Sequence, residues 1–374
     1  LHSGIRETSG EAKGKNQLYS LCGSFSYFHK SLNQSVMKIL IVAFSLLCTS
    51  FIQAQPVRLA VAGISHGHNA WILGRKNDAA IQLVGIYETN QELIKKMTDK
   101  FHLDPSLFYD DLNKMLDAVK PEGVLGFGTT LQHLSVVEAC APKGIHVMVE
   151  KPMATTVADA EKMVALARKN NILLLTNFET SWYPTTDRSF ALTRDTSFMG
   201  QIRKVVVHDG HEGPKEIGVS KEFFEWLTDP IKNGGGALMD FGCYGANLMT
   251  LLMNGEIPTS VTAVTSQFKP TIYPKVEDEA TIVLKYPSAQ CIIQASWNWP
   301  FARKDMAIYG SNGYIITKDN NNMKAKGKAS AEQEYKLTPQ ETNTYTSPFL
   351  YFADAIRKKI SIPSFGTYSM ENNL

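Results

Sequence analysis

From Pro56 to about residue 178, short apolar runs alternate with longer stretches in which apolar residues recur every three or four positions. The short runs are typical of buried strands, and the longer stretches are typical of amphipathic helices. Strands that alternate with helices at this spacing predict parallel βαβ units in a doubly wound sheet. The expected strands are residues 57–64, 81–88, 123–128, 145–150 and 172–178, and the expected helices are residues 65–76, 89–102, 129–144 and 155–171.

The second half of the chain follows a different pattern. Its strand-like runs succeed one another largely without helices, which is typical of an antiparallel sheet. They are residues 202–210, 260–268, 279–286, 290–299 and 304–317. One side of such a sheet needs cover, so we expect a homo-oligomer that forms through it.

One apolar helix in this half carries an unusual polar stripe. Three glycines open the stretch "NGGGALMDFGCYGANLMTLLM", residues 233–253, in which Asp240, Tyr244 and Asn247 are spaced four and three residues apart. This spacing places the three side chains on one helical face. Because polar groups are costly to bury without partners, the stripe should meet water, other polar groups or a ligand.

The N-terminal residues look like a leader. Met37 and Lys38 precede an apolar run from Ile39 to Ile52, and a small residue, Ala54, follows it. This pattern predicts a secretory signal over residues 37–54 that is cleaved near Ala54, with residues 1–36 as upstream read-through. A buried core helix is the alternative, and the run is too short for a membrane span of about 20 residues. We therefore expect export to the periplasm without stable membrane insertion after cleavage.

Composition narrows the class of protein. The chain has 374 residues, of which 44% are hydrophobic and 20% charged, and a formal net charge of +2. This size accommodates two domains, and the balanced charge gives no support to nucleic-acid binding. After Ala54 the cysteines Cys140, Cys243 and Cys291 are widely spaced, which indicates neither a disulfide framework nor a metal cluster.

The first turn of the predicted sheet, "AGISHGH", partly matches the Gly-x-Gly-x-x-Gly fingerprint of dinucleotide-binding folds. Gly63 and Gly67 are present, whereas Ser65 and His68 take the positions of the other two glycines. Glu88 ends the second strand, where a carboxylate can accept from both ribose hydroxyls and would repel a 2′-phosphate. The pattern favours NAD over NADP, although a plain strand-to-helix turn would also explain the glycines.

A second landmark is "EKP". Glu150, Lys151 and Pro152 close an apolar strand at the edge where such sheets bind ligands. A lysine at the end of a buried strand is unusual, because lysine is rarely buried unless it is paired. A surface lysine beside a loop proline is the alternative.

With "EKP" followed by "GGGALMDFGCY", the chain resembles the glucose–fructose oxidoreductase, inositol dehydrogenase and rhizopine-catabolism (Gfo/Idh/MocA) family over about residues 56–374. Further landmarks in the family's order are His133 in "GTTLQH", "EDEATIVLKYPSAQ", "MAIYGSNGYI" and "YFADAIRKKI". The resemblance implies a Rossmann NAD-binding domain, residues 55–178, and a C-terminal α/β domain with a large open, mostly antiparallel sheet, residues 179–374. It also implies that "SMENNL" opens a last helix that is truncated here.

The resemblance assigns roles to particular residues. Lys151 would lie at the nicotinamide and the reacting hydroxyl, with Asp240 and Tyr244 facing it. Tyr244 would be the base, and since a phenol has a pKa of about 10, the Lys151 ammonium would be needed to lower it. Asp240 would orient the hydroxyl or Lys151. The cofactor contacts implied are Gly63, Ser65, His66, Gly67, Glu88, Thr129, His133, Glu150 and Lys151.

The sequence departs from the family at several of these positions. Tyr244 stands where many members have His, Asn247 stands where Asp is common, and "GTT" replaces Thr-Pro-Asn before His133. The first turn lacks two glycines, so Ser65 or His66 would have to supply contacts to the pyrophosphate.

The expected substrate is a carbohydrate. Trp182 and Tyr183 follow the last Rossmann strand and could stack on a sugar ring, and His211 lies on a loop expected to overhang the site. Because no third ligand lies near His208 and His211, we expect no metal there. An exported nicotinamide enzyme allows three functions: a sugar oxidoreductase that keeps its NAD(H) and closes its own redox cycle, an NAD-dependent glycosidase, or a non-catalytic binding protein. The combination of Lys151, Asp240 and Tyr244 argues against the binding protein, and we expect the oxidoreductase, with the glycosidase as the alternative.

Overall fold

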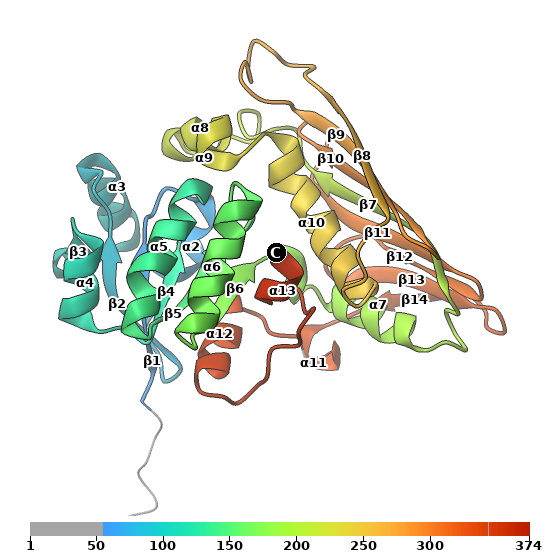
Figure 1. The fold of residues 1–374 in the computed structure, drawn as a ribbon, viewed down its shortest axis with the longest axis horizontal. Helices are drawn as coiled ribbons and strands as arrows, with labels where there is room; N and C mark the ends of the chain where they lie inside the picture. The colour runs from blue at the N-terminus through green and yellow to red at the C-terminus, as the bar shows by residue number, and fades with distance from the viewer. Residues whose placement is uncertain (1–54, 343) are drawn as a thin grey trace, which may run out of the picture. The chain divides into compact units, whose positions relative to one another are not determined.

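The computed structural model describes residues 55–342 and 344–374, which form two sheets with helices packed against them (Figure 1). The predicted read-through and signal segments fall on residues 1–54 and lie outside the described residues. Within the described part, no helix is both long and apolar enough to cross a membrane.

The first sheet has six parallel strands in the order β3-β2-β1-β4-β5-β6. This is the strand order of a Rossmann fold, in which the crevice for the ligand lies beyond the carboxyl ends of the strands. The strands are β1 Val57–Ala62, β2 Ile81–Tyr87, β3 Phe108–Tyr109, β4 Gly123–Gly126, β5 His146–Glu150 and β6 Leu174–Asn177. All five predicted strands are confirmed, and the two-residue β3 is too short to stand out in the sequence.

The helices of this half follow the predicted ranges with shorter bounds. The side chain of Asn90 caps α3 by accepting from the Leu93 N–H, and Thr156 caps α6 by accepting from the Asp159 N–H. The elements are η1 Gly67–Asn69, α2 Ala70–Leu73, α3 Gln91–Phe101, η2 Pro105–Leu107, α4 Leu112–Val119, η3 Thr130–Gln132, α5 His133–Cys140, η4 Ala141–Lys143 and α6 Val157–Lys169. The sequence predicted nothing over residues 103–122, where η2, β3 and α4 lie.

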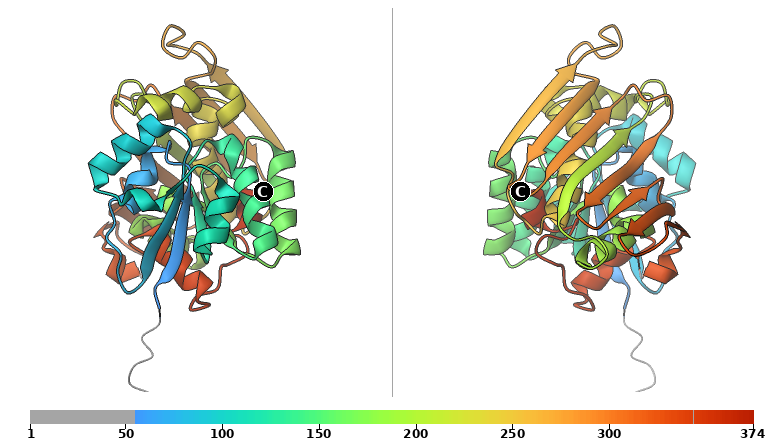
Figure 2. Two further views of the ribbon diagram at one scale, coloured as in Figure 1. Left: turned by 90° about the vertical axis from the view of Figure 1, so that its left-hand side faces the viewer. Right: turned by 90° about the vertical axis from the view of Figure 1, so that its right-hand side faces the viewer.

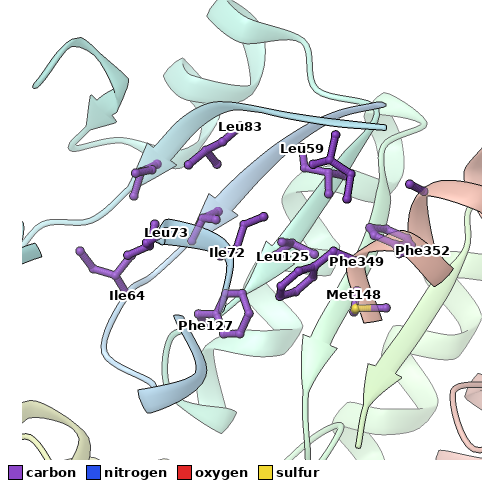
Figure 3. Packing of buried hydrophobic residues seen from close by; sticks show 14 of the residues in the cluster. Leu59, Ile64, Ile72, Leu73, Leu83, Leu125, Phe127, Met148, Phe349 and Phe352 are labelled. Carbon is purple, nitrogen blue, oxygen red and sulfur yellow. The ribbon is translucent and has the colours of Figure 1, made fainter. Parts of the chain in front are cut away.

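Apolar side chains cover both faces of the parallel sheet. On one face, Phe349 and Phe352 of α12 (Pro348–Ile356) join Leu59, Leu125 and Met148 in a single cluster (Figure 3). The sequence assigns all of residues 179–374 to the second domain, but α12 packs into the core of the first.

The second sheet has eight strands in the order β14-β13-β12-β11-β7-β10-β9-β8, and only β7 and β10 pair in parallel. The strands are β7 Ile202–Gly210, β8 Ser260–Ser266, β9 Glu279–Lys285, β10 Gln290–Ser296, β11 Arg303–Gly310, β12 Gly313–Thr317, β13 Asn322–Gly327 and β14 Gln333–Lys336. The sequence missed β13 and β14, whose "NMKAKG" and "QEYK" are too polar to suggest buried strands. The mostly antiparallel second sheet is confirmed.

The remaining helices belong to the second half of the chain. They are η5 Glu179–Trp182, α7 Pro184–Arg194, α8 Lys221–Leu227, α9 Pro230–Asn233, α10 Ala237–Leu252, α11 Pro339–Thr342, α12 and α13 Met370–Asn373. The long α10 packs on one face of the sheet against β7, β9 and β10, and no described helix covers the opposite face, seen in the right-hand view of Figure 2. The glycines before α10 have a steric reason, because a Cβ on Gly236 would lie 1.9 Å from the carbonyl oxygen of Glu277.

Candidate active site

The first turn of the parallel sheet lies against the turn that follows β4. Gly63, directly after β1, has a φ of +78°, a conformation that favours glycine. A Cβ at this position would lie 2.6 Å from the Cα of Gly128, so the two turns approach this closely only without a side chain. The Gly63 N–H also donates to the carbonyl of Tyr87 at 2.8 Å. The carboxyl ends of β1, β2 and β4 therefore meet where such sheets bind nucleotides.

Glu88 lies at this edge, directly after β2. Its Oε2 accepts from the Ile64 N–H at 3.1 Å, and its Oε1 accepts from the N–H groups of Thr89 and Asn90 at 2.9 and 3.0 Å. Three backbone donors thus fix the carboxylate beside the first turn, at the position that the fingerprint requires for an acceptor of ribose hydroxyls.

A cavity of about 200 Å³ opens beside Glu88. Gly63, Ser65, Glu88 and Thr129 line it from the first half of the chain, and Glu222, Trp226 and Lys232 line it from α8 and α9. These features fit a dinucleotide. The turn at Gly63 lets a phosphate approach the backbone closely, the Glu88 carboxylate can accept from ribose hydroxyls, and Lys232 can compensate phosphate charge.

Helix α8 covers the first turn. The rings of Phe223 and Trp226 lie 4.7 and 5.7 Å from the ring of His66, measured between centroids. An ion pair of 3.2 Å between Lys96 and Glu222 joins α8 to α3. Trp226 is 4% exposed, and its indole N–H has no hydrogen-bond partner among the described residues. A buried unpaired donor in the wall of this cavity is suited to an acceptor on a bound ligand.

A cluster of imidazoles surrounds Glu150, the last residue of β5. His66 Nδ1 accepts from the N–H of His68 at 3.0 Å, and Asn177 Nδ2 donates to Glu150 Oε1 at 2.7 Å. His68 Nδ1 lies 3.1 Å from Glu150 Oε2 without the alignment of a hydrogen bond. Burial lowers the pKa of His66, lowers that of His68 to about 3, and raises that of Glu150. Both imidazoles are therefore neutral near pH 7.

The potential ligand atoms of His66, His68 and Glu150 lie within 4.8 Å of one another, so their spacing suits a metal ion. However, His66 Nδ1 already accepts a hydrogen bond, and the proton of the neutral ring must then sit on Nε2. Neither ring nitrogen of His66 is free to coordinate in this arrangement, and we assign no step to a metal.

Lys151 follows β5 and forms a buried ion pair with Asp240 of α10. Its Nζ lies 2.5 Å from Asp240 Oδ1 and donates to the Asp240 carbonyl at 2.9 Å, while Trp297 Nε1 donates to Asp240 Oδ2 at 2.9 Å. Lys151 is 7% exposed and Asp240 is 4% exposed. Burial alone would lower the pKa of Lys151, but the Asp240 carboxylate raises it above its usual value. Both groups are therefore charged.

Tyr244 lies one turn beyond Asp240 on α10. It is 1% exposed, and Lys151 Nζ lies 5.2 Å from the centre of its ring. Burial raises the pKa of Tyr244 well above its usual value, and the negative charge of Glu179 adds to this effect. Burial and the surrounding carboxylates therefore outweigh any lowering by Lys151, and the role of Lys151 in tuning this phenol stays a prediction. The hydroxyl is held as a protonated phenol.

Comparison with known protein families accounts for both halves of the chain. Residues 57–178 match an oxidoreductase family described as an NAD-binding Rossmann fold, and residues 195–316 match the GFO/IDH/MocA C-terminal domain. The chain belongs to the Gfo/Idh/MocA oxidoreductase family. The expected Rossmann domain with a second, mostly antiparallel sheet is thereby confirmed.

Two relatives of this Gfo/Idh/MocA chain indicate the range of the similarity. It is 30% identical over 185 residues to the trans-1,2-dihydrobenzene-1,2-diol dehydrogenase of Xenopus tropicalis, covering 49% of this chain and 51% of the relative. It is 24% identical over 202 residues to the myo-inositol 2-dehydrogenase of Thermotoga maritima, covering 54% of each. The match thus spans about half the length of these relatives.

Solved structures show the same fold over most of the chain. The aldose-aldose oxidoreductase of Caulobacter crescentus, complexed with glycerol, superposes with a TM-score of 0.69 at 23% identity and covers 85% of this chain and 94% of that chain. An inositol dehydrogenase homologue of Azotobacter vinelandii, complexed with NADH and myo-inositol, has a TM-score of 0.70 at 17% identity and covers 86% and 93%. At these identities the likeness establishes the fold alone.

The polar stripe of α10 divides between two environments in this Gfo/Idh/MocA protein. Asp240 and Tyr244 face Lys151, whereas Asn247 Nδ2 donates at 2.8 Å to the Thr367 carbonyl and at 2.8 Å to the side chain of Asn372. The expectation that Asn247 contacts the substrate does not fit this arrangement, because its amide holds the C-terminal segment.

The two aromatic residues after β6 also lie in different contacts. Trp182 packs edge-on against Trp71 with ring centres 5.1 Å apart, and the Tyr183 hydroxyl donates to Glu179 Oε1 at 2.9 Å. Tyr183 thus positions a carboxylate near Tyr244, and stacking of either ring on a sugar stays a prediction.

The two histidines of the predicted overhanging loop have separate partners. His208 lies on β7 with its Nδ1 2.9 Å from Asp305, whereas His211 Nδ1 accepts from the Gly213 N–H at 2.9 Å. The His211 ring packs edge-on against Phe241, with centres 5.0 Å apart. His211 therefore lies beside α10 near the Lys151–Asp240 pair.

Thr129 and His133 stabilise the turn after β4. The Thr129 N–H donates to Gln132 Oε1 at 2.8 Å and the residue lines the nucleotide cavity. His133 Nδ1 lies 3.1 Å from the Met153 carbonyl, and burial lowers the pKa of His133 to about 4. His133 is therefore a neutral, buried ring that joins this turn to the segment after Pro152.

The sequence missed several side chains around Tyr244 and the nucleotide cavity. They are Glu179, Asp209, Trp226, Trp297 and Lys304. One signal was available, because Asp209 interrupts the apolar run "VVVHDG" at a position that alternation places on the inner face of β7.

Proposed function

We propose that this chain transfers a hydride between NAD and a hydroxyl-bearing carbon of a sugar or cyclic polyol. The observation that carries the proposal is the buried Lys151–Asp240 pair beside Tyr244, at the edge of the sheet where the nucleotide cavity opens. The names of the relatives, which are dehydrogenases of diols and of inositol, support a polyhydroxylated substrate for this chain as well.

When bound, NAD supplies the acceptor for the hydride, and the residues of this chain handle the proton. The Lys151 ammonium donates to the substrate oxygen and stabilises negative charge that develops there. Tyr244 Oη exchanges a proton with the same oxygen. Because burial keeps this hydroxyl protonated, it is ready to donate as an acid when a carbonyl is reduced. Oxidation of an alcohol needs the deprotonated form, so its rate should increase with pH.

We propose NAD rather than NADP as the cofactor. Backbone N–H groups fix the carboxylate of Glu88 beside the first turn, and Glu222 also lines the cavity, so the 2′-phosphate of an NADP bound there would meet negative charge. We also propose that the nucleotide stays bound between turnovers. The support is the cover over the first turn, where Phe223 packs on His66 and Thr130 Oγ1 donates to Asn233 Oδ1 at 3.0 Å.

A glycosidase that works through transient oxidation would need a further base near the substrate. His211 is the histidine beside α10, but its Nδ1 accepts a hydrogen bond, so the neutral ring carries its proton on Nε2. This arrangement does not favour a base at His211, and we retain hydride transfer between sugars as the proposal.

We propose further that the chain assembles with copies of itself through the outer face of the second sheet. Val264 of β8 lies opposite Thr281 of β9, on the face of the sheet that points away from α10, and is 67% exposed. A Val264→Lys variant should then have a lower mass by light scattering than the parent protein.

Export is proposed from the signal-like residues 37–54 alone, and a processed N-terminus of the secreted protein would test it.

The first experiment is to denature the purified protein and measure the nucleotide that it releases. Near-stoichiometric NAD(H) would support both the cofactor and its retention, and no nucleotide, with none bound on titration, would refute the proposed function. A panel of free sugars, cyclic polyols and aryl glycosides then identifies the reaction, because release of an aglycone would indicate the glycosidase. Lys151→Met should retain the nucleotide while turnover is lost.

A further inference from the structure

A second lysine–carboxylate pair lies beside Tyr244, on elements other than those that carry Lys151 and Asp240. Lys304 of β11 forms an ion pair with Glu179 of η5, and Lys304 Nζ lies 5.1 Å from the centre of the Tyr244 ring. The corresponding distance from Lys151 is 5.2 Å. Two ammonium groups, each paired with a carboxylate, therefore lie equally close to the same phenol.

The surroundings hold the second pair in place. The Tyr183 hydroxyl donates to Glu179 Oε1 at 2.9 Å. Burial opposes ionisation of Glu179, but Lys304 lowers the pKa of this carboxyl below its usual value, so it is charged at neutral pH. The pair is partly open, with side-chain exposures of 21% for Lys304 and 28% for Glu179.

A third group, Asp209, lies directly opposite Lys304 in the register of β7 and β11. Asp209 is 1% exposed, and neither carboxyl oxygen has a hydrogen-bond partner among the described residues. Burial raises the pKa of Asp209 well above its usual value. Glu179, and not Asp209, is the carboxylate that forms an ion pair with Lys304.

We infer that Lys304 is a second cation that stabilises the deprotonated form of Tyr244, and that Glu179 weakens this effect by pairing with Lys304. The inference rests on the proposed role of Tyr244 in proton transfer. Charged or titratable groups on the surrounding elements act on this phenol. They are Glu150 at the end of β5, Lys151 directly after β5, Glu179 of η5, Asp240 and Cys243 of α10, and Lys304 of β11. Among them, Lys304 and Glu179 can be changed without touching the Lys151–Asp240 pair.

Removing the two members of the pair should have opposite effects. Without the Lys304 ammonium, the phenolate loses a nearby positive charge, so the pKa of Tyr244 rises. With Glu179→Gln, the lysine charge is no longer compensated and the pKa of Tyr244 falls. Glutamine also retains an acceptor for Tyr183, so the local packing is preserved.

The test is the pH dependence of sugar oxidation in Lys304→Met, Glu179→Gln and the double variant. The pH at which the rate reaches half its maximum should move up by about one unit or more in Lys304→Met and down by a similar amount in Glu179→Gln, the usual scale for one charge this close. The double variant should fall between the two. Lys304→Arg should restore the parent midpoint.

Lys324→Met is the matched control. Lys324 lies on β13 of the same sheet and also forms an ion pair, with Glu332 at 3.2 Å. Its midpoint should equal that of the parent protein. Midpoints that stay unchanged, or move in the same direction in both single variants, would overturn the inference, since a purely structural role predicts common losses without opposite shifts.

A second readout does not depend on turnover. Ultraviolet difference titration of the NAD-bound protein, with Tyr244→Phe subtracted, measures ionisation of this phenol directly. Its midpoint should be higher in Lys304→Met than in Glu179→Gln, and equal midpoints would refute the role of the pair even if no sugar is oxidised. If Tyr244→Phe oxidises sugars at the parent rate, the proposed proton transfer by Tyr244 fails instead, whatever the titration shows.

Discussion

Lys151 Nζ and Asp240 Oδ1 lie 2.5 Å apart in a site where both side chains are almost fully buried. One residue comes from the end of a parallel strand in the first half of the chain, and the other from α10 in the second half. The pair therefore joins the two halves at the carboxyl edge of the Rossmann sheet. A buried pair of this kind is sensitive to the loss of either member.

Replacing Lys151 should separate chemistry from nucleotide binding. We expect Lys151→Met to reduce turnover by about two to four orders of magnitude, the scale for loss of a group that acts on the transferred proton, while NADH still binds. Because the Asp240 carboxylate is then buried without its counter-ion, the free energy of unfolding should also fall by about 3–5 kcal/mol. The double variant Lys151→Met/Asp240→Asn should regain most of that stability without regaining turnover. Near-normal turnover in Lys151→Met would refute the assigned role.

The turn at Gly63 should tolerate no side chain. Gly63→Ala combines a positive φ with a contact of 2.6 Å to a backbone atom, whereas Gly144 has a φ of +70° with no atom within 4 Å of an added Cβ. Gly144→Ala should therefore lose only about 1–2 kcal/mol of unfolding free energy for the backbone strain. Gly63→Ala should lose clearly more and should bind NADH weakly, as urea unfolding and NADH titration would show. Equal losses of unfolding free energy in Gly63→Ala and Gly144→Ala would show that the contact between Gly63 and Gly128 leaves room for a side chain.

Glu88 should set the choice between NAD and NADP. Glu88→Gln keeps an acceptor for the N–H groups of Thr89 and Asn90 and removes the charge of the side chain. The ratio of the dissociation constants for NADP and NAD should then fall by about tenfold or more, which is about 1.4 kcal/mol. Glu92→Gln, on the exposed first turn of α3, is the control. An unchanged ratio in Glu88→Gln would refute the assignment.

Trp226 should report on the nucleotide. Its ring lines the cavity and its indole N–H lacks a partner, so a bound nucleotide can accept from it. We expect Trp226→Phe to weaken NADH binding by about threefold to tenfold, the scale of one hydrogen bond, and to reduce energy transfer from tryptophan to bound NADH. Trp299→Phe should leave both unchanged, because Trp299 packs on His208 of the second sheet. Unaltered binding by Trp226→Phe would exclude the hydrogen bond.

His133 should make the folded protein sensitive to acid. Burial lowers its pKa to about 4 in the folded state, whereas an unfolded histidine titrates near pH 6.5, so the unfolded state binds more protons between these values. Stability contributed by the neutral ring is therefore present above about pH 6.5 and is lost as the pH falls, by about 3 kcal/mol at pH 4.

The measurement is the free energy of unfolding in urea from pH 7 to pH 4.5. It should decline less steeply in His133→Gln than in the parent protein, even if the variant is less stable at pH 7. His102→Asn, at an exposed position after α3, should keep the parent slope. If the free energy of unfolding of His133→Gln falls with pH as steeply as that of the parent protein, the proposed buried neutral state of His133 is wrong.

Much of the fold could be predicted because the local pattern is strong. The five long strands of the first sheet are bounded by glycines and polar caps, so apolar runs locate them, and Asn90 and Thr156 mark helix starts through a hydrogen bond that spans only three residues. The sequence failed at β3, α4, β13 and β14, which are short or polar and owe their conformation to neighbouring strands. It also could not show that α12 returns to the first core.

The sequence by itself determined the nucleotide-binding sheet with an acidic residue after its second strand and, through the family's motifs, pointed to Lys151, Asp240 and Tyr244. Only the tertiary structure decided their charge states and their neighbours. It pairs Lys151 with Asp240, turns Asn247 toward the C-terminal segment, and brings Lys304 and Glu179 to Tyr244 from 125 residues apart. The physical reason is that helix period and strand alternation act over a few residues, whereas burial and Coulomb interactions depend on which distant side chains share a space.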